Sequence, residues 1–245
     1  MSEKTKAAAH STATPAKKVG RRPKSGPDVS REAMIECAIR IARSESLGEV
    51  SMVRIGKELG VAAGMVHYHM SSRDDLISTV INAAFKERFD RLPAPTGEWR
   101  HDLEQFALSS LDTMERWPGL ATYILTENKF RLFQRVQPGE TDYGLAYFDH
   151  MGRILVNMGV NGAMGAMIYH LLLLFVTVMA AEKENRQSPA THGDFISAHL
   201  ARFANDSYPG ATFLAAPFAS LNSPTTYETG VAILLDGFEK WIGQD

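Results

Sequence analysis

Hydrophobic positions recur at helical spacing along most of this 245-residue chain. Apolar residues that return every three or four positions form one face of an amphipathic helix. No stretch of useful length alternates apolar and polar residues as a half-buried strand does. The pattern therefore predicts an all-α fold, with helices over residues 30–46, 51–59, 62–70, 74–91, 99–116, 119–135, 141–158, 163–181 and 227–242. A looser stretch, 184–226, carries only a short helical pattern and prolines that include Pro209, Pro217 and Pro224.

The segment from Ser51 to Leu76 is the most informative part of the chain. Ser51 is a typical N-cap, because its hydroxyl can accept a bond from a backbone N–H at a helix start. Gly60 can adopt the left-handed conformation that ends a helix, and Gly56 leaves room for a second helix to cross closely. Two short helices joined by such a turn indicate a helix-turn-helix. The alternative is an ordinary αα-hairpin inside a helical core.

The second helix of this pair would present its exposed side chains to DNA. Ala63 and Met65 stand near its start, and His67 and Tyr68 follow. Small residues at the start let a helix enter a major groove about 12 Å wide, and polar aromatic side chains can reach phosphates. We expect these four residues, together with Ser51, to contact DNA.

Composition and charge divide the chain into three parts. Residues 1–27 are rich in Ala, Ser, Thr, Pro and Lys and are predicted to be a disordered basic arm. Residues 28–92 form the predicted three-helix helix-turn-helix DNA-binding domain, and residues 93–245 a helical ligand-binding and dimerisation domain. The first 24 residues carry seven basic side chains against one acidic, whereas residues 93–245 carry 10 basic and 17 acidic ones. Positive charge is thus concentrated just ahead of the helix-turn-helix.

The arm ends in a short Arg/Pro segment that contains Arg21, Arg22 and Lys24. Such a segment suits a narrow minor groove, whose negative potential attracts arginine. The equally weighted alternative is a solvated tail that adds only unspecific affinity, because basic runs alone are weak signals.

Two motifs of the chain resemble the signature of the tetracycline-repressor (TetR) family of bacterial regulators. They are Ile55-Gly56-Lys57-Glu58-Leu59-Gly60-Val61 and the run from Gly64 to Leu76, and Tyr208-Pro209 with Tyr227 to Phe238 is similar to the end of that family's C-terminal domain. The resemblance implies an all-α homodimer that binds a palindromic double-stranded DNA operator and releases it when a small molecule binds. By position it also implies that Ala63, Met65, His67 and Tyr68 face DNA and that Arg73 binds a phosphate.

Residues 163–181 carry no formal charge and are almost long enough to span a membrane. His170 in the middle of the segment and the lack of a second such segment favour a buried helix instead. An all-apolar helix suits a core that continues into a subunit interface. We therefore expect a homodimer through residues 161–183 and 227–242, and no membrane span. A single cysteine, Cys37, and the lack of a signal-peptide apolar core favour the cytoplasm.

The resemblance to the TetR family implies that an effector pocket lies among the C-terminal helices. Its expected lining is apolar with a few polar groups and suits an apolar or aromatic effector: Trp117, Tyr123, Tyr147, Met151, Met167, His170 and Phe175, with Phe130 and Phe148 as further candidates. No catalytic motif, cofactor fingerprint or metal-ligand spacing accompanies them, so we expect no enzyme, no cofactor and no metal. The alternatives are a ligand-independent architectural DNA-binding protein and an enzyme or carrier built on the helical body.

Deletion of residues 1–24 is expected to weaken DNA binding and to flatten its salt dependence, because the rest of the DNA-binding domain is nearly neutral. The slope of log affinity against log salt should fall by roughly 0.9 for each phosphate that the truncated protein no longer neutralises. A salt titration of full-length and truncated protein on the same duplex measures this, and an unchanged slope contradicts it.

Overall fold

The computed structural model describes residues 29–203 and 207–243. Every regular element within these ranges is helical, which confirms the predicted all-α class. The predicted arm, with Arg21, Arg22 and Lys24, lies outside them. The elements are α1 (Arg31–Ser44), η1 (Leu47–Glu49), α2 (Met52–Leu59), α3 (Ala63–Met70), α4 (Arg73–Arg91), α5 (Trp99–Arg116), α6 (Leu120–Thr126), α7 (Tyr143–Asn157), α8 (Gly162–Glu184), η2 (Pro189–His192), α9 (Gly193–Leu200), α10 (Pro209–Ala219) and α11 (Ser223–Ile242).

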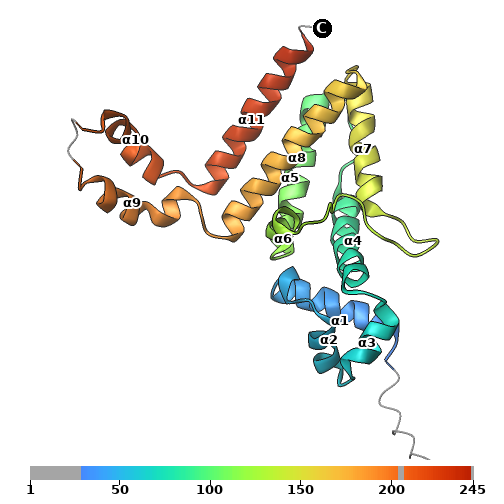
Figure 1. Ribbon diagram of the computed structural model, residues 1–245. Coiled ribbons are helices and arrows are strands. Elements are labelled where there is room, and N and C mark those ends of the chain that lie inside the picture. Colours follow the sequence, from blue (N-terminus) through green and yellow to red (C-terminus); the bar gives the residue numbers. More distant parts are fainter. Residues whose placement is uncertain (1–28, 204–206, 244–245) are drawn as a thin grey trace, which may run out of the picture.

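Helices α1 to α3 form a small head at one end of the molecule (Figure 1). Serine hydroxyls begin three of the first four helices. Ser30 accepts from the Ala33 N–H at 3.2 Å, and Ser51 accepts from the Arg54 N–H at 3.1 Å. Ser72 accepts from the Asp75 N–H at 3.0 Å. Because capping is a local interaction, the sequence predicted these starts within one residue.

The turn between α2 and α3 confirms the predicted helix-turn-helix. Gly60 is left-handed, with φ of +67°, and ends α2. The Val61 N–H donates to the Gly56 carbonyl at 2.9 Å. A Cβ built on Gly56 would lie only 2.8 Å from the Val61 carbonyl oxygen and 3.2 Å from the Ala63 nitrogen. The crossing of α2 and α3 therefore depends on the missing side chain at Gly56.

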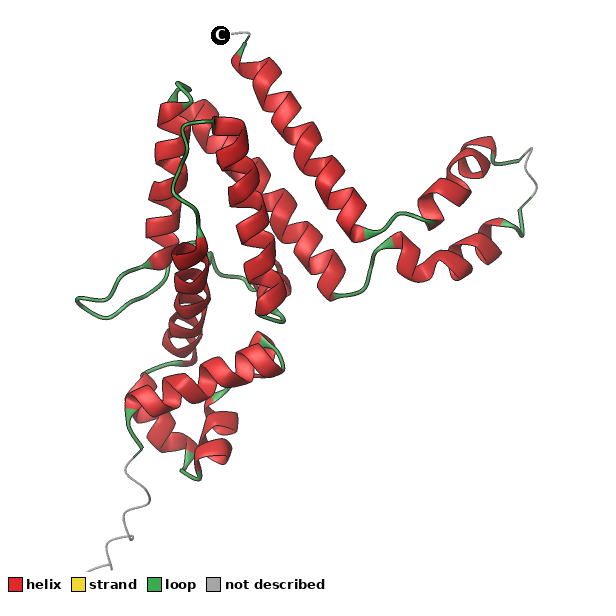
Figure 2. Cartoon of the chain, turned by 180° about the vertical axis from the view of Figure 1, so that it is seen from behind, coloured by secondary structure: helices red, strands yellow, loops and turns green. Residues whose placement is uncertain are grey.

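Helix α4 connects the head to the body. It packs against α1 and α3 of the head and against α5 and α7 of the body. Its buried stripe is apolar except for two polar side chains, and consists of Leu76, Ile77, Ser78, Val80, Ile81, Ala84, Phe85 and Arg88. The body beyond it contains α5, α7, α8 and α11, with α8 packed against α5, α6 and α11 (Figure 2).

Helix α8 is long and apolar enough to cross a membrane by length and composition, and half of its apolar window is buried within the chain. A core helix passes the same test. Its buried face includes Met164, Ile168, Leu172 and Val176, which belong to the hydrophobic core.

The predicted helix over residues 119–135 is wrong beyond its first half. Helix α6 ends at Thr126, and residues 127–142 form a loop. Hydrogen bonds to side chains hold this loop in place of helical hydrogen bonds. The Asp142 carboxylate caps α7 through the Gly144 N–H at 2.9 Å and also accepts from the Gln134 N–H at 3.1 Å.

The stretch 184–226 contains more helix than its prolines predicted. Helices α9 and α10 form an arm that projects from the body and is drawn in orange in Figure 1. Pro209 and Pro224 stand in the first turns of α10 and α11. Proline is tolerated there because the first N–H groups of a helix have no intrahelical acceptor. These two prolines therefore begin helices, and α11 starts at Ser223 instead of residue 227.

Replacement of Gly56 by valine is expected to lower the free energy of unfolding by about 1–3 kcal/mol, because the new side chain meets backbone that cannot move aside. Urea denaturation measures the loss. Gly64→Ala is the matched control, since a Cβ there meets nothing within 4 Å. Gly64→Ala should leave stability unchanged or raise it slightly. Equal stability of Gly56→Val and wild type would contradict the role assigned to Gly56.

Candidate nucleic-acid interface and effector region

Helix α3 turns two aromatic side chains outward at the tip of the head. Tyr68 is 84% exposed, and His67 is exposed beside it, while Ala63 and Met65 are half-buried. Val66 and Met70 are buried and fix the helix against the head. The structure therefore brings the predicted reading residues together on one short helix.

Ser51 and Arg73, which were also predicted to contact DNA, differ in exposure. The Ser51 hydroxyl is half-buried and accepts from the Arg54 N–H as the cap of α2. Arg73 begins α4 and is exposed. Contact of these residues with DNA stays a prediction.

One of the two positive charges on α2, that of Arg54, is already engaged by acids of the head. The Arg54 guanidinium donates to both carboxylate oxygens of Glu45, at 2.7 and 3.0 Å, and to Glu58 at 2.9 Å. Helix α3 itself contains no lysine or arginine. The described head thus offers shape, backbone and aromatic side chains more than free cations, which fits the expected dependence on a basic arm.

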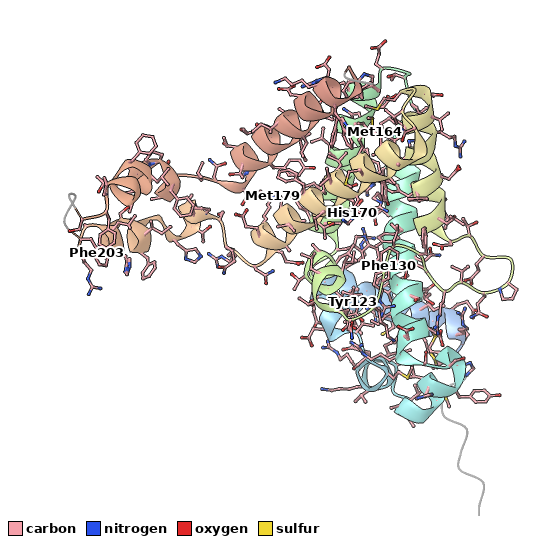
Figure 3. All side chains as sticks on the ribbon, turned by 45° about the horizontal axis from the view of Figure 1, so that its top comes forward. Tyr123, Phe130, Met164, His170, Met179 and Phe203 are labelled. Atoms are coloured by element: carbon pink, nitrogen blue, oxygen red, sulfur yellow. The ribbon has the colours of Figure 1, made fainter. Side chains whose placement is uncertain are left out.

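The seven residues predicted to line an effector pocket do not surround one cavity of the structure. Trp117 and Tyr123 are buried near α6, and Tyr147 and Met151 are buried on the inner face of α7. Met167 and His170 are exposed on α8, and Phe175 stacks on Tyr227 of α11 with ring centroids 5.8 Å apart. Figure 3 shows Tyr123 on α6 and His170 on α8. Their role in ligand binding stays a prediction.

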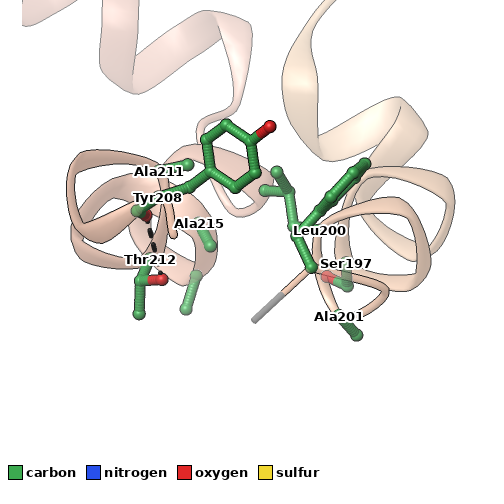
Figure 4. A pocket seen from close by; sticks show the side chains of 9 residues that line it. Ser197, Leu200, Ala201, Tyr208, Ala211, Thr212 and Ala215 are labelled. Atoms are coloured by element: carbon green, nitrogen blue, oxygen red, sulfur yellow. Dashed lines mark hydrogen bonds between the residues drawn. The ribbon is translucent and has the colours of Figure 1, made fainter. Parts of the chain in front are cut away.

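A cavity of about 470 Å³ lies in the arm between α9 and α10 (Figure 4). Its walls include Leu200, Phe203 and Tyr208. A second cavity, of about 260 Å³, lies between α7 and α8 and is lined by Phe148, which the sequence had singled out, and by Tyr169.

A buried arginine of α4, which the sequence did not single out, lies against the aromatic ring of Tyr147 on α7. Arg88 of α4 is 2% exposed, and its guanidinium carbon lies 3.4 Å from the centroid of the Tyr147 ring. The Tyr147 hydroxyl bonds the Ser110 hydroxyl at 2.5 Å and donates to the Phe106 carbonyl at 3.2 Å. Burial lowers the pKa of Arg88, and burial raises the pKa of Tyr147 and of Tyr169. A signal existed, since Arg88 continues the apolar stripe of α4 at helical spacing.

An ion cluster joins the head to the loop 127–142. Asp74, in the first turn of α4, accepts from Arg131 at 2.8 Å and from Lys129 at 2.9 Å. Hydrogen bonding by Lys129, supported by Arg131, lowers the pKa of Asp74. A second connection runs from the Trp117 indole N–H to Glu87 of α4, at 3.2 Å. Ion pairs and hydrogen bonds thus tie both halves of α4 to the body.

A helix-turn-helix head that shares one long helix with a larger all-helical body defines a class of two-domain helix-turn-helix proteins. Residues 92–242 match the family described as "Tetracyclin repressor-like, C-terminal domain". The chain belongs to this tetracycline-repressor-like (TetR) family, as the resemblance implied.

Similar proteins carry regulator names. The chain is 30% identical over 105 residues to the HTH-type transcriptional repressor DrrR1 of Streptomyces coeruleorubidus, and 29% identical over 98 residues to the HTH-type transcriptional repressor Rv1353c of Mycobacterium tuberculosis. These matches span 41% and 40% of this chain and about two-fifths (38%) of either relative.

Solved structures share the fold. Apo ActR from Streptomyces coelicolor aligns with a TM-score of 0.74 at 23% identity, over 90% of this chain and 99% of that one. ActR in complex with actinorhodin aligns with a TM-score of 0.71 at 24% identity, over 87% of this chain and 98% of that one.

Replacement of Asp74 by asparagine is expected to lower the free energy of unfolding at neutral pH by about 1–3 kcal/mol, because Arg131 is then left buried without its carboxylate. Since the pKa of Asp74 is depressed in the folded state, its contribution is present above the unfolded pKa and is lost as pH falls through the folded pKa. The difference between variant and wild type should therefore shrink in acid.

Urea denaturation across a pH series from neutral to acid measures this difference. Asp149→Asn is the control, because Asp149 pairs with Arg153 on the exposed surface of α7 and should change stability by less than about 1 kcal/mol. A deficit for Asp74→Asn that does not change with pH would contradict the assignment.

Proposed function

We propose that this protein is a DNA-binding transcriptional repressor that binds a palindromic operator as a homodimer and is released by a small-molecule effector. The observation that carries the proposal is the exposed α3, which presents Ala63, Met65, His67 and Tyr68 at the tip of a head fixed to the body by α4. The names of DrrR1 and Rv1353c support the repressor activity. We also propose that the protein acts in the cytoplasm and has no enzymatic activity.

An exposed apolar stripe on α8 supports the homodimer. Met167, Leu171, Leu174 and Val178 follow one another at intervals of four, three and four residues, and all are exposed in the single chain. This spacing is the seam of a helix that packs on another helix. Ile233 and Trp241 of α11 are exposed as well. Two helices from each subunit would bury these side chains in a two-fold four-helix bundle.

The release step follows from α4. An effector that binds the body more tightly in one arrangement of α4 shifts the population toward that arrangement, and the spacing of the two heads changes with it. ActR was solved in complex with actinorhodin, which supports a small-molecule effector for this chain as well. An effector with equal affinity for both arrangements would release nothing.

Selection from a random-sequence DNA pool tests the proposal. The full-length protein should enrich an inverted repeat, because two heads related by a two-fold axis read two related half-sites. Retention of DNA without an enriched repeat would instead favour the ligand-independent architectural protein.

The substitution Leu174→Glu tests dimerisation without changing helix α3. Leu174 is 44% exposed on α8, far along the chain from α3, and a charge there should leave a monomer by sedimentation equilibrium. The same variant should lose enrichment of the repeat while it keeps a folded head. Leu125→Glu on α6, at an equally exposed leucine (43%), should stay dimeric and keep the enrichment. A dimeric Leu174→Glu would contradict the α8 interface.

A further inference from the structure

The buried guanidinium of Arg88 has donors that no described residue satisfies. Its Nε and Nη2 atoms are buried and lack a hydrogen-bond partner within residues 29–203 and 207–243. One face of the group is covered by Tyr147, at 3.4 Å, and Phe85 lies 4.5 Å away. Aromatic faces stabilise a cation, but they do not accept its in-plane N–H bonds as an oxygen does.

Two acidic side chains of α4 and α5, Glu87 and Asp102, are engaged elsewhere. Glu87, the preceding residue, pairs with Arg43 at 3.0 Å and with Arg91 at 2.7 Å. The Asp102 carboxylate accepts from the backbone N–H groups of Thr96 and Gly97. Arg88 therefore carries a buried positive charge without a protein counter-ion in the described chain, an arrangement that destabilises a fold unless something else pairs with it.

The geometry of the free donors specifies what would pair with them. Nε–H and one Nη2–H lie along the same edge of the planar guanidinium. This edge matches the two oxygens of a carboxylate, which arginine binds with two parallel hydrogen bonds. The Tyr169 hydroxyl is a third buried group without a partner in the described chain. Its side chain lines the 260 Å³ cavity between α7 and α8.

We propose that the effector is an apolar, aromatic carboxylic acid whose carboxylate pairs with Nε and Nη2 of Arg88 and accepts a hydrogen bond from the Tyr169 hydroxyl. The inference deepens the proposed function and rests on it for the regulatory consequence. The ring system of the acid would lie against Phe106 and Phe148, whose rings already contact Tyr169 with centroids 6.0 and 5.0 Å away.

The position of Arg88 explains how such a ligand would act. The cavity is smaller than the roughly 300–1,000 Å³ usual for small-molecule sites, and Tyr169 but not Arg88 lines it, so the ligand must extend it toward α4 by moving α7 or α8. Arg88 stands on α4 itself, the helix that carries the head. A carboxylate bound to Arg88 would therefore act directly on the position of α4, which sets the spacing of the two α3 helices in the dimer.

Calorimetric titration of the full-length protein tests the carboxylate site with a matched pair of probes, 2-naphthylacetic acid and its neutral amide, 2-naphthylacetamide. Wild type should bind the acid at least roughly tenfold more tightly than the amide, the effect of a charge-assisted bidentate bond. Arg88→Met keeps an unbranched apolar stem and removes the guanidinium charge, so it should abolish the preference and leave the amide affinity unchanged.

Three further variants keep the test decisive if Arg88→Met does not fold. Arg88→Lys retains the charge without the planar edge and should reduce the preference. Tyr169→Phe retains the ring without the hydroxyl and should weaken acid binding alone. Arg153→Met, at an exposed arginine of α7 paired with Asp149, should change nothing.

A wild type that shows no preference for the acid, or that binds neither probe, would overturn the proposal. A preference that survives in Arg88→Met would overturn it as well. If Arg88→Met is unfolded, a preference that survives in both Arg88→Lys and Tyr169→Phe would do the same. These titrations contain no DNA. A carboxylate site that binds as expected in a protein that enriches no operator would therefore refute the proposed function and leave the site standing.

Discussion

Helix α4 packs against the head and the body at once, and the rest of the molecule is arranged around that constraint. It contacts α1 and α3 of the head and α5 and α7 of the body. The buried stripe runs from Leu76 to Arg88 without interruption, so the helix cannot bend in the middle without exposing apolar surface. Side chains of the body hold it at both ends, Arg131 on Asp74 and Trp117 on Glu87. Head and body therefore move against one another only when these contacts rearrange together.

Two buried arginines of this chain illustrate opposite solutions to the same electrostatic problem. Arg131 loses its water but gains Asp74, and the pair joins the loop 127–142 to the head. Arg88 loses its water and gains only aromatic faces. A chain selected only for stability would be better served by an apolar residue at position 88, since an unpaired buried charge is costly. Residues that break the local rules of burial are expected at functional sites, which is why Arg88 points to a ligand.

The exposed apolar surface of the single chain is equally uneven. Part of it lies on the outer face of α8, on α11 and over the arm, where Phe195, Phe213 and Leu214 are exposed. Exposed apolar patches are typical of an interface. The outer face of α8 is exposed apolar surface, and the Nε/Nη2 edge of the Arg88 guanidinium is a charged group without a partner in the described chain. Each indicates a different partner.

The sequence by itself determined the features that depend on neighbours within a few residues. Serine caps, the left-handed Gly60, the close approach at Gly56 and the apolar stripes of α4 and α8 were predicted because each rests on local hydrogen bonds or helical spacing. Only the tertiary structure decided that residues 127–142 are a loop, since Asp74 of the distant α4 pairs there with Lys129 and Arg131. It also decided that Pro209 and Pro224 begin helices. Arg88 stood on the predicted buried face, but its lack of a counter-ion depends on four helices that meet only in the folded chain.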